Sequence, residues 1–160
     1  DDGKTWQVIG PIHDGEKFNA IQPSILRYKD GSLQVLCRSQ ESVLVESWSS
    51  DGGQTWSKPA PTALPNPNAG TDATTLKDGR QILIYNHTVR RAPFPANRNM
   101  LNVAISTDGK QWKTVLTLER DKNEYSYPTV IQDADGMIHV VYTWRRQTVK
   151  HVEIDPSKLK

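Results

Sequence analysis

The stretch "SWSSDGGQTWS" at residues 47–57 decides the fold, because it places a β-prone run, a glycine-rich turn and a tryptophan next to one another. It nearly recurs as "DDGKTW" at residues 1–6 and as "STDGKQW" at residues 106–112. In such a turn the aspartate and serine side chains bind nearby backbone groups, the glycines permit positive φ, and the tryptophan covers the gap between neighbouring sheets. We interpret the motif as a structural clasp at the end of a strand.

A second turn motif repeats in step with the first. The tryptophans that end the three motifs, Trp6, Trp56 and Trp112, lie 50 and 56 residues apart. Asp-Gly turns at residues 30–31, 78–79 and 135–136 lie 48 and 57 residues apart. Because two independent turn motifs share a period of about fifty residues, the sequence predicts a repeat protein.

Short runs rich in Val, Ile, Leu, Tyr and Thr lie between these turns, and none shows a sustained helical period. Each repeat therefore indicates four antiparallel strands joined by hairpins, the pattern of a β-propeller blade. We predict an all-β fold of about three blades, half of a six-bladed propeller. The expected parts are residues 1–12 as the last strand of a preceding blade, and 20–63, 70–118 and 125–155 as three blades.

Composition narrows the class of protein. The chain has 160 residues, 36% of them hydrophobic, a formal net charge of +2 and no long apolar stretch, so we expect one globular unit that binds neither nucleic acid nor membranes. The single cysteine, Cys37, excludes an intrachain disulfide framework and leaves the compartment open. His87 and His151 lack the spacing of metal ligands, so we expect no metal and no cofactor. Because the sequence opens inside a motif, we expect a longer parent protein.

Hairpin geometry sends the remaining loops to one rim of the propeller. Both kinds of turn join alternate strands and share one rim, so the other loops gather at the opposite rim. Seven of the nine arginines map there: Arg38, Arg90, Arg91, Arg98, Arg120, Arg145 and Arg146. The guanidinium group pairs bidentately with carboxylates and sulfates, so this rim predicts an anionic ligand. The alternative is ordinary surface charge held in local salt bridges.

The turn motif resembles the Asp-box of sialidases and related propellers, S-x-D-x-G-x-T-W. The residues that match it in full are Ser49, Asp51, Gly53, Thr55 and Trp56; Asp1 and Trp6 match its second half, and Ser106, Asp108 and Trp112 form a shorter version. The resemblance implies that these residues are structural and lie on the face away from an active site.

The resemblance also implies a set of site residues. Sialidases hold a sialate carboxylate with three arginines and attack with a tyrosine that is paired with a glutamate, and an aspartic acid serves as general acid and base. "EYSYPTVIQDADGMIHVVYTW" at residues 124–144 resembles the nucleophile segment, which implies Tyr125, with Glu124 beside it. "IQPSILRYKDGSLQVLCRS" at residues 21–39 places Arg38 at one arginine, and "RNMLNVAISTDG" at residues 98–109 places Arg98 at another.

One position departs from the family pattern. Gln22 stands where the family has its glutamate, and an amide cannot take a proton from the tyrosine. Either another carboxylate serves, or the chemistry differs, or there is none. The polar segments at residues 66–72 and 142–151 add Asp72, Arg145 and Arg146 as candidate substrate contacts. The long loop expected at residues 86–99 adds His87.

Three functions stay open at this stage. The first is a sialidase-like glycoside hydrolase domain that recognises an acidic saccharide, the fragment alone being inactive. The second is a carbohydrate-binding propeller module without turnover, and the third is a hydrolase or lyase that acts on another acidic glycan. A second copy of the chain, or a separate N-terminal half, is expected to complete a six-bladed ring.

Overall fold

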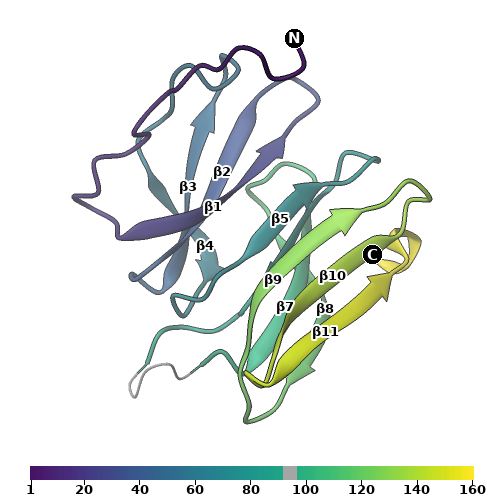
Figure 1. The fold of residues 1–160 in the computed structure, drawn as a ribbon. Coiled ribbons are helices and arrows are strands. Elements are labelled where there is room, and N and C mark those ends of the chain that lie inside the picture. Colours follow the sequence, from purple (N-terminus) through teal and green to yellow (C-terminus); the bar gives the residue numbers. More distant parts are fainter. Residues whose placement is uncertain (92–96) are drawn as a thin grey trace.

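The computed structural model describes residues 1–91 and 97–160, and its regular structure there is almost entirely β (Figure 1). The centre of the long loop expected at residues 86–99 lies outside the described residues. The elements are β1 (Ala20–Arg27), β2 (Leu33–Ser39), β3 (Val43–Ser49), β4 (Ala60–Pro65), β5 (Asp72–Thr75), β6 (Gln81–Tyr85), β7 (Met100–Ser106), β8 (Lys113–Arg120), β9 (Tyr125–Gln132), β10 (Ile138–Trp144), β11 (Thr148–Ile154) and a short 3₁₀ turn, η1 (Pro156–Lys158).

These strands form three antiparallel sheets, which we call the first, second and third blades. The first has the order β1-β2-β3-β4, the second β5-β6-β7-β8, and the third, with three strands, β9-β10-β11. Each blade begins with the strand nearest its neighbours, since β5 contacts both β1 and β9. Figure 1 shows these three strands side by side and running the same way. The chain is therefore an all-β array of three propeller blades.

Apolar side chains fill the two spaces between the blades. Leu36 and Leu44 of the first blade pack with Leu83 and Tyr85 of the second. Ile82 and Leu101 of the second blade belong to another buried cluster with Val140 of the third. Burying one such side chain contributes about 1.5–3 kcal/mol, so these two clusters hold the blades at fixed angles.

The N-terminal segment has no regular structure. Residues 1–12 contain no strand and belong to none of the three sheets of the described chain. Their expected place as the last strand of a preceding blade stays a prediction. Ile12 and Phe18 pack with Val35 and Cys37 on the outer face of the first blade.

The turn motif at residues 49–56 is closed by its own side chains. Ser49 donates to a carboxylate oxygen of Asp51 at 2.8 Å and accepts from the Gly53 amide at 2.8 Å. The other Asp51 oxygen accepts from the Thr55 hydroxyl at 2.6 Å, and the Trp56 indole donates to the Gly53 carbonyl at 3.0 Å. This network gives each residue type of the motif a specific bond.

The same contacts recur in the other two copies. Asp1 accepts from the Thr5 amide at 3.0 Å, as Asp51 does from the Thr55 amide, and Ser106 donates to Asp108 at 3.0 Å. Trp6 and Trp112 donate to glycine carbonyls at 2.9 Å, but Trp6 is 87% exposed whereas Trp112 is partly buried. The turn chemistry is thus local, and burial of the tryptophan depends on a neighbouring blade.

Replacing Asp51 by Asn is expected to destabilise the fold in a pH-dependent way. Hydrogen bonds from Thr55 and Ser49 lower the pKa of Asp51 from 3.8 to about 2 in the folded protein. The ionised group therefore stabilises the fold above its unfolded pKa, and the effect disappears as the pH falls towards about 2. Urea unfolding should show the gap between wild type and Asp51→Asn closing over that range. A gap of constant size, or an equal gap for the exposed Asp2→Asn control, would contradict this.

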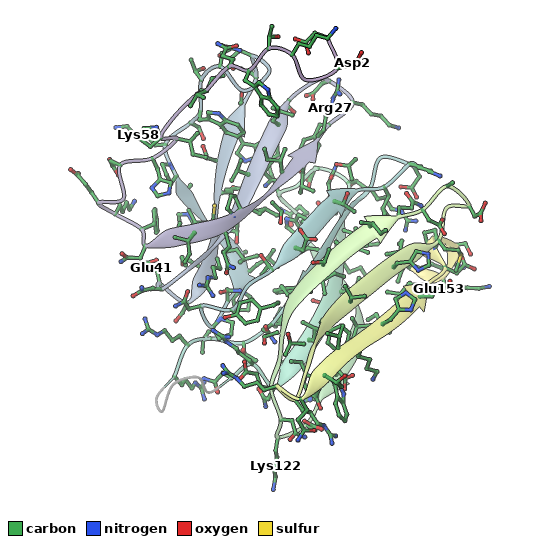
Figure 2. The ribbon with its side chains drawn as sticks, in the orientation of Figure 1. Asp2, Arg27, Glu41, Lys58, Lys122 and Glu153 are labelled. Carbon is green, nitrogen blue, oxygen red and sulfur yellow. The ribbon has the colours of Figure 1, made fainter. Side chains whose placement is uncertain are left out.

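The two ends of the blades carry different loops. The hairpins that follow β1, β5 and β9 lie at one end with the turn motifs at residues 49–56 and 106–112. Figure 2 shows Arg27, at the end of β1, and Lys122, in the loop before β9, at opposite ends of the molecule. We call the first end the Asp-box rim and the second the arginine rim.

Candidate functional site

Two arginines from neighbouring blades converge at the arginine rim. Arg38 lies near the end of β2, paired with Ile21 of β1, and Arg98 lies just before β7. Both donate to the backbone carbonyl of Asn68, Arg38 at 3.2 Å and Arg98 at 3.1 Å. The loop between the first and second blades therefore holds two guanidinium groups around one oxygen atom.

The charge around this oxygen is predominantly positive. Arg38 forms no ion pair within the part of the chain that is described, and its buried Nε and the Asn68 Oδ1 have no hydrogen-bond partner there. Arg98 lies 3.4 Å from one oxygen of Glu124. Two like charges this close repel each other unless an anion joins them, and unpaired buried polar atoms are costly. The arrangement suits a carboxylate ligand.

A tyrosine that the sequence analysis did not select stands beside the arginine pair. The Tyr127 side chain is 48% exposed, and the Arg98 guanidinium carbon lies 5.5 Å from its ring centre. A hydrogen bond from Arg98, and the charges of Arg98 and Arg38, lower the pKa of the Tyr127 phenol. The cationic pair thus favours the phenolate, which is the nucleophilic form.

Backbone bulges direct Tyr127 and Gln22 to this place. Each is a non-glycine residue with positive φ, 52° and 54°, immediately before a proline. The ladder of β1 shifts register between Ile21 and Pro23, and the β9–β10 ladder shifts across from Tyr127. Bulges and left-handed residues re-aim side chains and concentrate at functional sites.

Gly70 leaves the space into which both side chains turn. A Cβ atom at this position would lie 3.0 Å from the Tyr127 ring and 3.3 Å from the Gln22 amide oxygen. Any larger residue would push against both groups. The structure therefore places Gln22 and Tyr127 against the same glycine. The sequence suggested that the residue at position 22 lies beside a tyrosine, and the tyrosine beside Gln22 in the structure is Tyr127.

Tyr125, the tyrosine selected from sequence, lies inside the protein. It is fully buried, and its hydroxyl donates to Asp121 at 2.7 Å. Its carbonyl accepts from Asn86 at 2.9 Å. These contacts fit a residue that anchors the start of the third blade, and a ligand at the arginine pair has no open approach to a side chain with no exposed surface.

Glu124 is held by two arginines. One oxygen accepts from Arg146 at 2.6 Å, and the other accepts from Ser126 at 3.1 Å and faces Arg98. Burial raises the pKa of Glu124, but the hydrogen bonds from Arg146 and Ser126 and the two charges outweigh it and lower the pKa. The carboxylate therefore stays ionised and fixes Arg98, rather than standing ready to take a proton.

Arg145 and His87 are engaged with residues near them. Arg145 pairs with Asp121 at 3.2 Å and stacks over the Trp144 ring at 4.1 Å. His87 hydrogen-bonds the Tyr85 hydroxyl through Nδ1. Their role as substrate contacts stays a prediction.

Asp72 joins the inner strands of all three blades. One of its oxygens accepts from the Ser24 hydroxyl of β1 at 2.9 Å, and the other accepts from the Val130 amide of β9 at 2.8 Å. Because each oxygen accepts a hydrogen bond from a different neighbouring blade, this carboxylate links the three blades. The sequence suggested a substrate contact at this position instead.

Replacing Asp72 by Ala is expected to lower the free energy of unfolding by about 3 kcal/mol, because hydrogen bonds to a charged group contribute about 1.5–3 kcal/mol each. Urea unfolding measures the change. Asp135→Ala is the matched control, since that aspartate is exposed in a turn and makes no side-chain hydrogen bond within residues 1–91 and 97–160. A loss at position 72 no larger than the control's would show that the link carries no stability.

The site therefore combines expected and unexpected residues. Contacts connect Arg38, Arg98, Glu124 and Arg146, and Gln22 and Tyr127 lie against Gly70 beside them, whereas Tyr125 is buried. The sequence contained one sign of this position, because Tyr127 precedes a proline just as Gln22 does.

Throughout the described ranges, no three His, Cys, Asp or Glu side chains are placed to hold a metal ion. Neither described range contains a helix with the length and apolar character needed to cross a membrane.

Comparison with known proteins identifies relatives of the fold. Residues 1–140 match the family model of the BNR repeat-like domain. A leech intramolecular trans-sialidase complexed with 2,7-anhydro-Neu5Ac superposes with a TM-score of 0.77 at 19% identity, covering 99% of this chain and 27% of that one. The NanB sialidase of Streptococcus pneumoniae gives 0.75 at 17% identity, covering 100% and 27%.

A third structure extends the comparison. The intramolecular trans-sialidase of Ruminococcus gnavus, in complex with oseltamivir carboxylate, has a TM-score of 0.72 at 21% identity and is covered over 37% of its length by the whole of this chain. A search of curated proteins found no match. The chain spans 27% to 37% of the length of these three structures. With the family model matching most of its length, this chain belongs to the BNR repeat-like family and has a sialidase-type propeller fold.

Proposed function

We propose that this chain carries the arginine–tyrosine part of a sialidase-like glycoside hydrolase site, which binds an acidic, carboxylate-bearing sugar. The observation that carries the proposal is the convergence of Arg38 and Arg98 on the Asn68 carbonyl, next to Tyr127. A sugar carboxylate between the two guanidinium groups would relieve their repulsion and accept hydrogen bonds from both. The sugar ring would then lie against the Tyr127 side chain.

Tyr127 lies beside the arginine pair, where its hydroxyl oxygen can act as the nucleophile. In the proposed reaction its phenolate oxygen forms a bond to the anomeric carbon, and the bond from that carbon to the leaving oxygen breaks. The leaving oxygen takes a proton from an acid supplied by other blades. Water then gives a proton to the conjugate base of that acid, and its oxygen bonds to the anomeric carbon as the bond to Tyr127 breaks. This step releases the sugar and restores both the phenolate and the acid. Sialidases with a tyrosine nucleophile are a recognised exception to the two-carboxylate scheme.

The phenol proton must leave Tyr127 although position 22 holds a glutamine instead of a glutamate. Gln22 lies against the same glycine as Tyr127, and its amide oxygen can accept a hydrogen bond but cannot hold the proton. The two arginines lower the pKa of Tyr127, and its half-exposed ring gives the hydroxyl access to solvent water. We therefore assign activation to the cationic pair and orientation to Gln22.

A carbohydrate-binding module without turnover is the second candidate function, and Gln22 is the residue that favours it. The chain spans only 27% of two of the sialidase structures, so the rest of the site would come from further blades. An N-terminal half of the same protein or a second copy of the chain are the two candidate sources of those blades.

The test uses the intact protein that contains this chain. It is titrated with 2,7-anhydro-Neu5Ac and assayed with a fluorogenic sialoside. Saturable binding together with hydrolysis supports the proposed enzyme. Binding without hydrolysis supports the module, and the absence of both would contradict recognition of a sialic acid at this site.

A further inference from the structure

A hollow of about 630 Å³ lies at the Asp-box rim, between the first and second blades. Its lining includes Tyr28, Lys29 and Asp30 from the β1–β2 hairpin, Trp48 from β3, and Asp108 and Lys110 from the turn after β7. Tyr28 follows Gln22 by six residues along β1, so the hollow lies about 20 Å from the arginine pair. It is therefore a separate feature from the site described above.

Two aromatic rings form one wall of the hollow. The Tyr28 and Trp48 ring centres are 5.0 Å apart with the planes tilted by 34°, and both side chains are partly exposed. Tyr28 is fixed in place because its hydroxyl donates to Gln34 and lies directly over Gly109, where a Cβ atom would come within 1.9 Å of it. The wall is thus a rigid, slightly concave aromatic surface.

The repeat shows that the blade architecture does not require these rings. Tyr28 and Trp48 stand at the positions that Leu76 and Ile105 occupy in the second blade, judged from the adjoining Asp-Gly turn and Asp-box serine. Leu76 is buried there, and Ile105 packs against the same cluster. Two aliphatic residues that close one gap between blades are therefore replaced by two aromatic residues beside an open hollow.

The indole of Trp48 also differs from those of the Asp-box tryptophans. Trp6, Trp56 and Trp112 each donate Nε1 to a glycine carbonyl of their own turn. Within the described residues the Trp48 Nε1 has no such acceptor, and Lys110 lies 6.0 Å from the ring centre. This indole is consequently available to a ligand as a stacking surface and as a donor.

The charges around the aromatic wall balance one another. Asp30 uses Oδ1 to accept from Ser32, and Asp108 uses Oδ1 to accept from the backbone amides of Lys110 and Gln111. The Oδ2 atom of each carboxylate has no partner among the residues that the structure describes. Two carboxylates, Asp30 and Asp108, and two ammonium groups, Lys29 and Lys110, thus line the hollow with no excess charge among them.

We propose that this hollow binds a neutral hexopyranose unit of an oligosaccharide. A pyranose ring presents an apolar C–H face, which suits the Tyr28–Trp48 wall, and an edge of vicinal hydroxyls, which suits a lining that holds both carboxylates and ammonium groups. Balanced charge gives an anionic sugar no advantage here. This site stands apart from the proposed function, so either can fail without the other.

The test follows the Trp48 indole N–H signal in ¹⁵N-labelled intact protein. Lactose, maltose, cellobiose and N-acetyllactosamine are the probes, and Trp48→Phe assigns the signal. We expect at least one sugar to shift this signal saturably. Isothermal titration calorimetry measures the affinity of that sugar for the variants, because Trp48→Ala lacks the indole, and Trp48→Ala and Asp30→Asn should weaken binding by about tenfold or more. The other indole signals report whether each variant is folded.

Tyr127→Phe serves as the matched control, because that residue lies at the arginine rim, and it should bind the neutral sugar as tightly as wild type. The proposal is overturned if none of the four sugars shifts the Trp48 signal. It is also overturned if folded Trp48→Ala binds as well as wild type, or if 3′-sialyllactose shifts the Trp48 signal at much lower concentration than lactose does.

Discussion

Tyr127→Phe in the intact protein is expected to lower kcat for a fluorogenic sialoside by on the order of 10³-fold or more, because the variant lacks the oxygen that would bond to the anomeric carbon. KM should change little, since the ring and both arginines remain. Loss in kcat with little change in KM distinguishes a nucleophile from a residue that only helps to bind the substrate.

The comparison with Tyr125→Phe makes this test specific. That variant loses the hydrogen bond to Asp121, so we expect lower stability by about 1–3 kcal/mol but turnover within a few-fold of wild type in the folded protein. Both assays are run well below the unfolding transition. Equal rates for wild type and Tyr127→Phe, or a large loss confined to Tyr125→Phe, would refute the assignment of Tyr127.

Arg38→Met is expected to weaken binding of 2,7-anhydro-Neu5Ac by about 10²- to 10³-fold, because losing one partner of a close charge pair costs roughly 2–5 kcal/mol. Methionine keeps the apolar stem and removes the guanidinium. Arg38 is preferred to Arg98 for this test, because Arg98 is buried beside Glu124 and its loss would leave that carboxylate without one of its cations.

Arg120→Met is the matched control for charge at the same rim. Arg120 is exposed at the end of β8, so its loss should change the dissociation constant little. A ligand whose carboxyl group is esterified should bind weakly to wild type and to Arg38→Met alike. Equal losses at positions 38 and 120, or undiminished binding of the ester, would show that the arginine pair does not hold a carboxylate.

The fold was largely predictable from sequence because its signals are local. Asp-Gly turns and the bonded Ser49–Trp56 motif depend on residues close in the chain, so their period revealed the three sheets. The role of the N-terminal segment stays a prediction, since a strand needs a partner and residues 1–12 belong to no sheet of the described chain. Residues close in the chain determine a turn, but they do not determine which strand lies next to it.

The site was only partly predictable, because small backbone irregularities decide it. Tyr125 and Tyr127 are two residues apart and would share a face in a regular strand. The bulge at Tyr127 separates them, leaving one fully buried and the other 48% exposed. A motif match cannot detect such a bulge. The role of Asp72 was likewise hidden, since its partners Ser24 and Val130 are more than forty residues away in the chain.

A crystal structure of the intact protein soaked with 2,7-anhydro-Neu5Ac would show where the sugar carboxylate is held. We predict that the sugar carboxylate accepts hydrogen bonds from both Arg38 and Arg98, with the ring against Tyr127. Sugar bound at another surface while the two arginines keep only their protein contacts, or bound with its carboxylate away from both, would contradict the account.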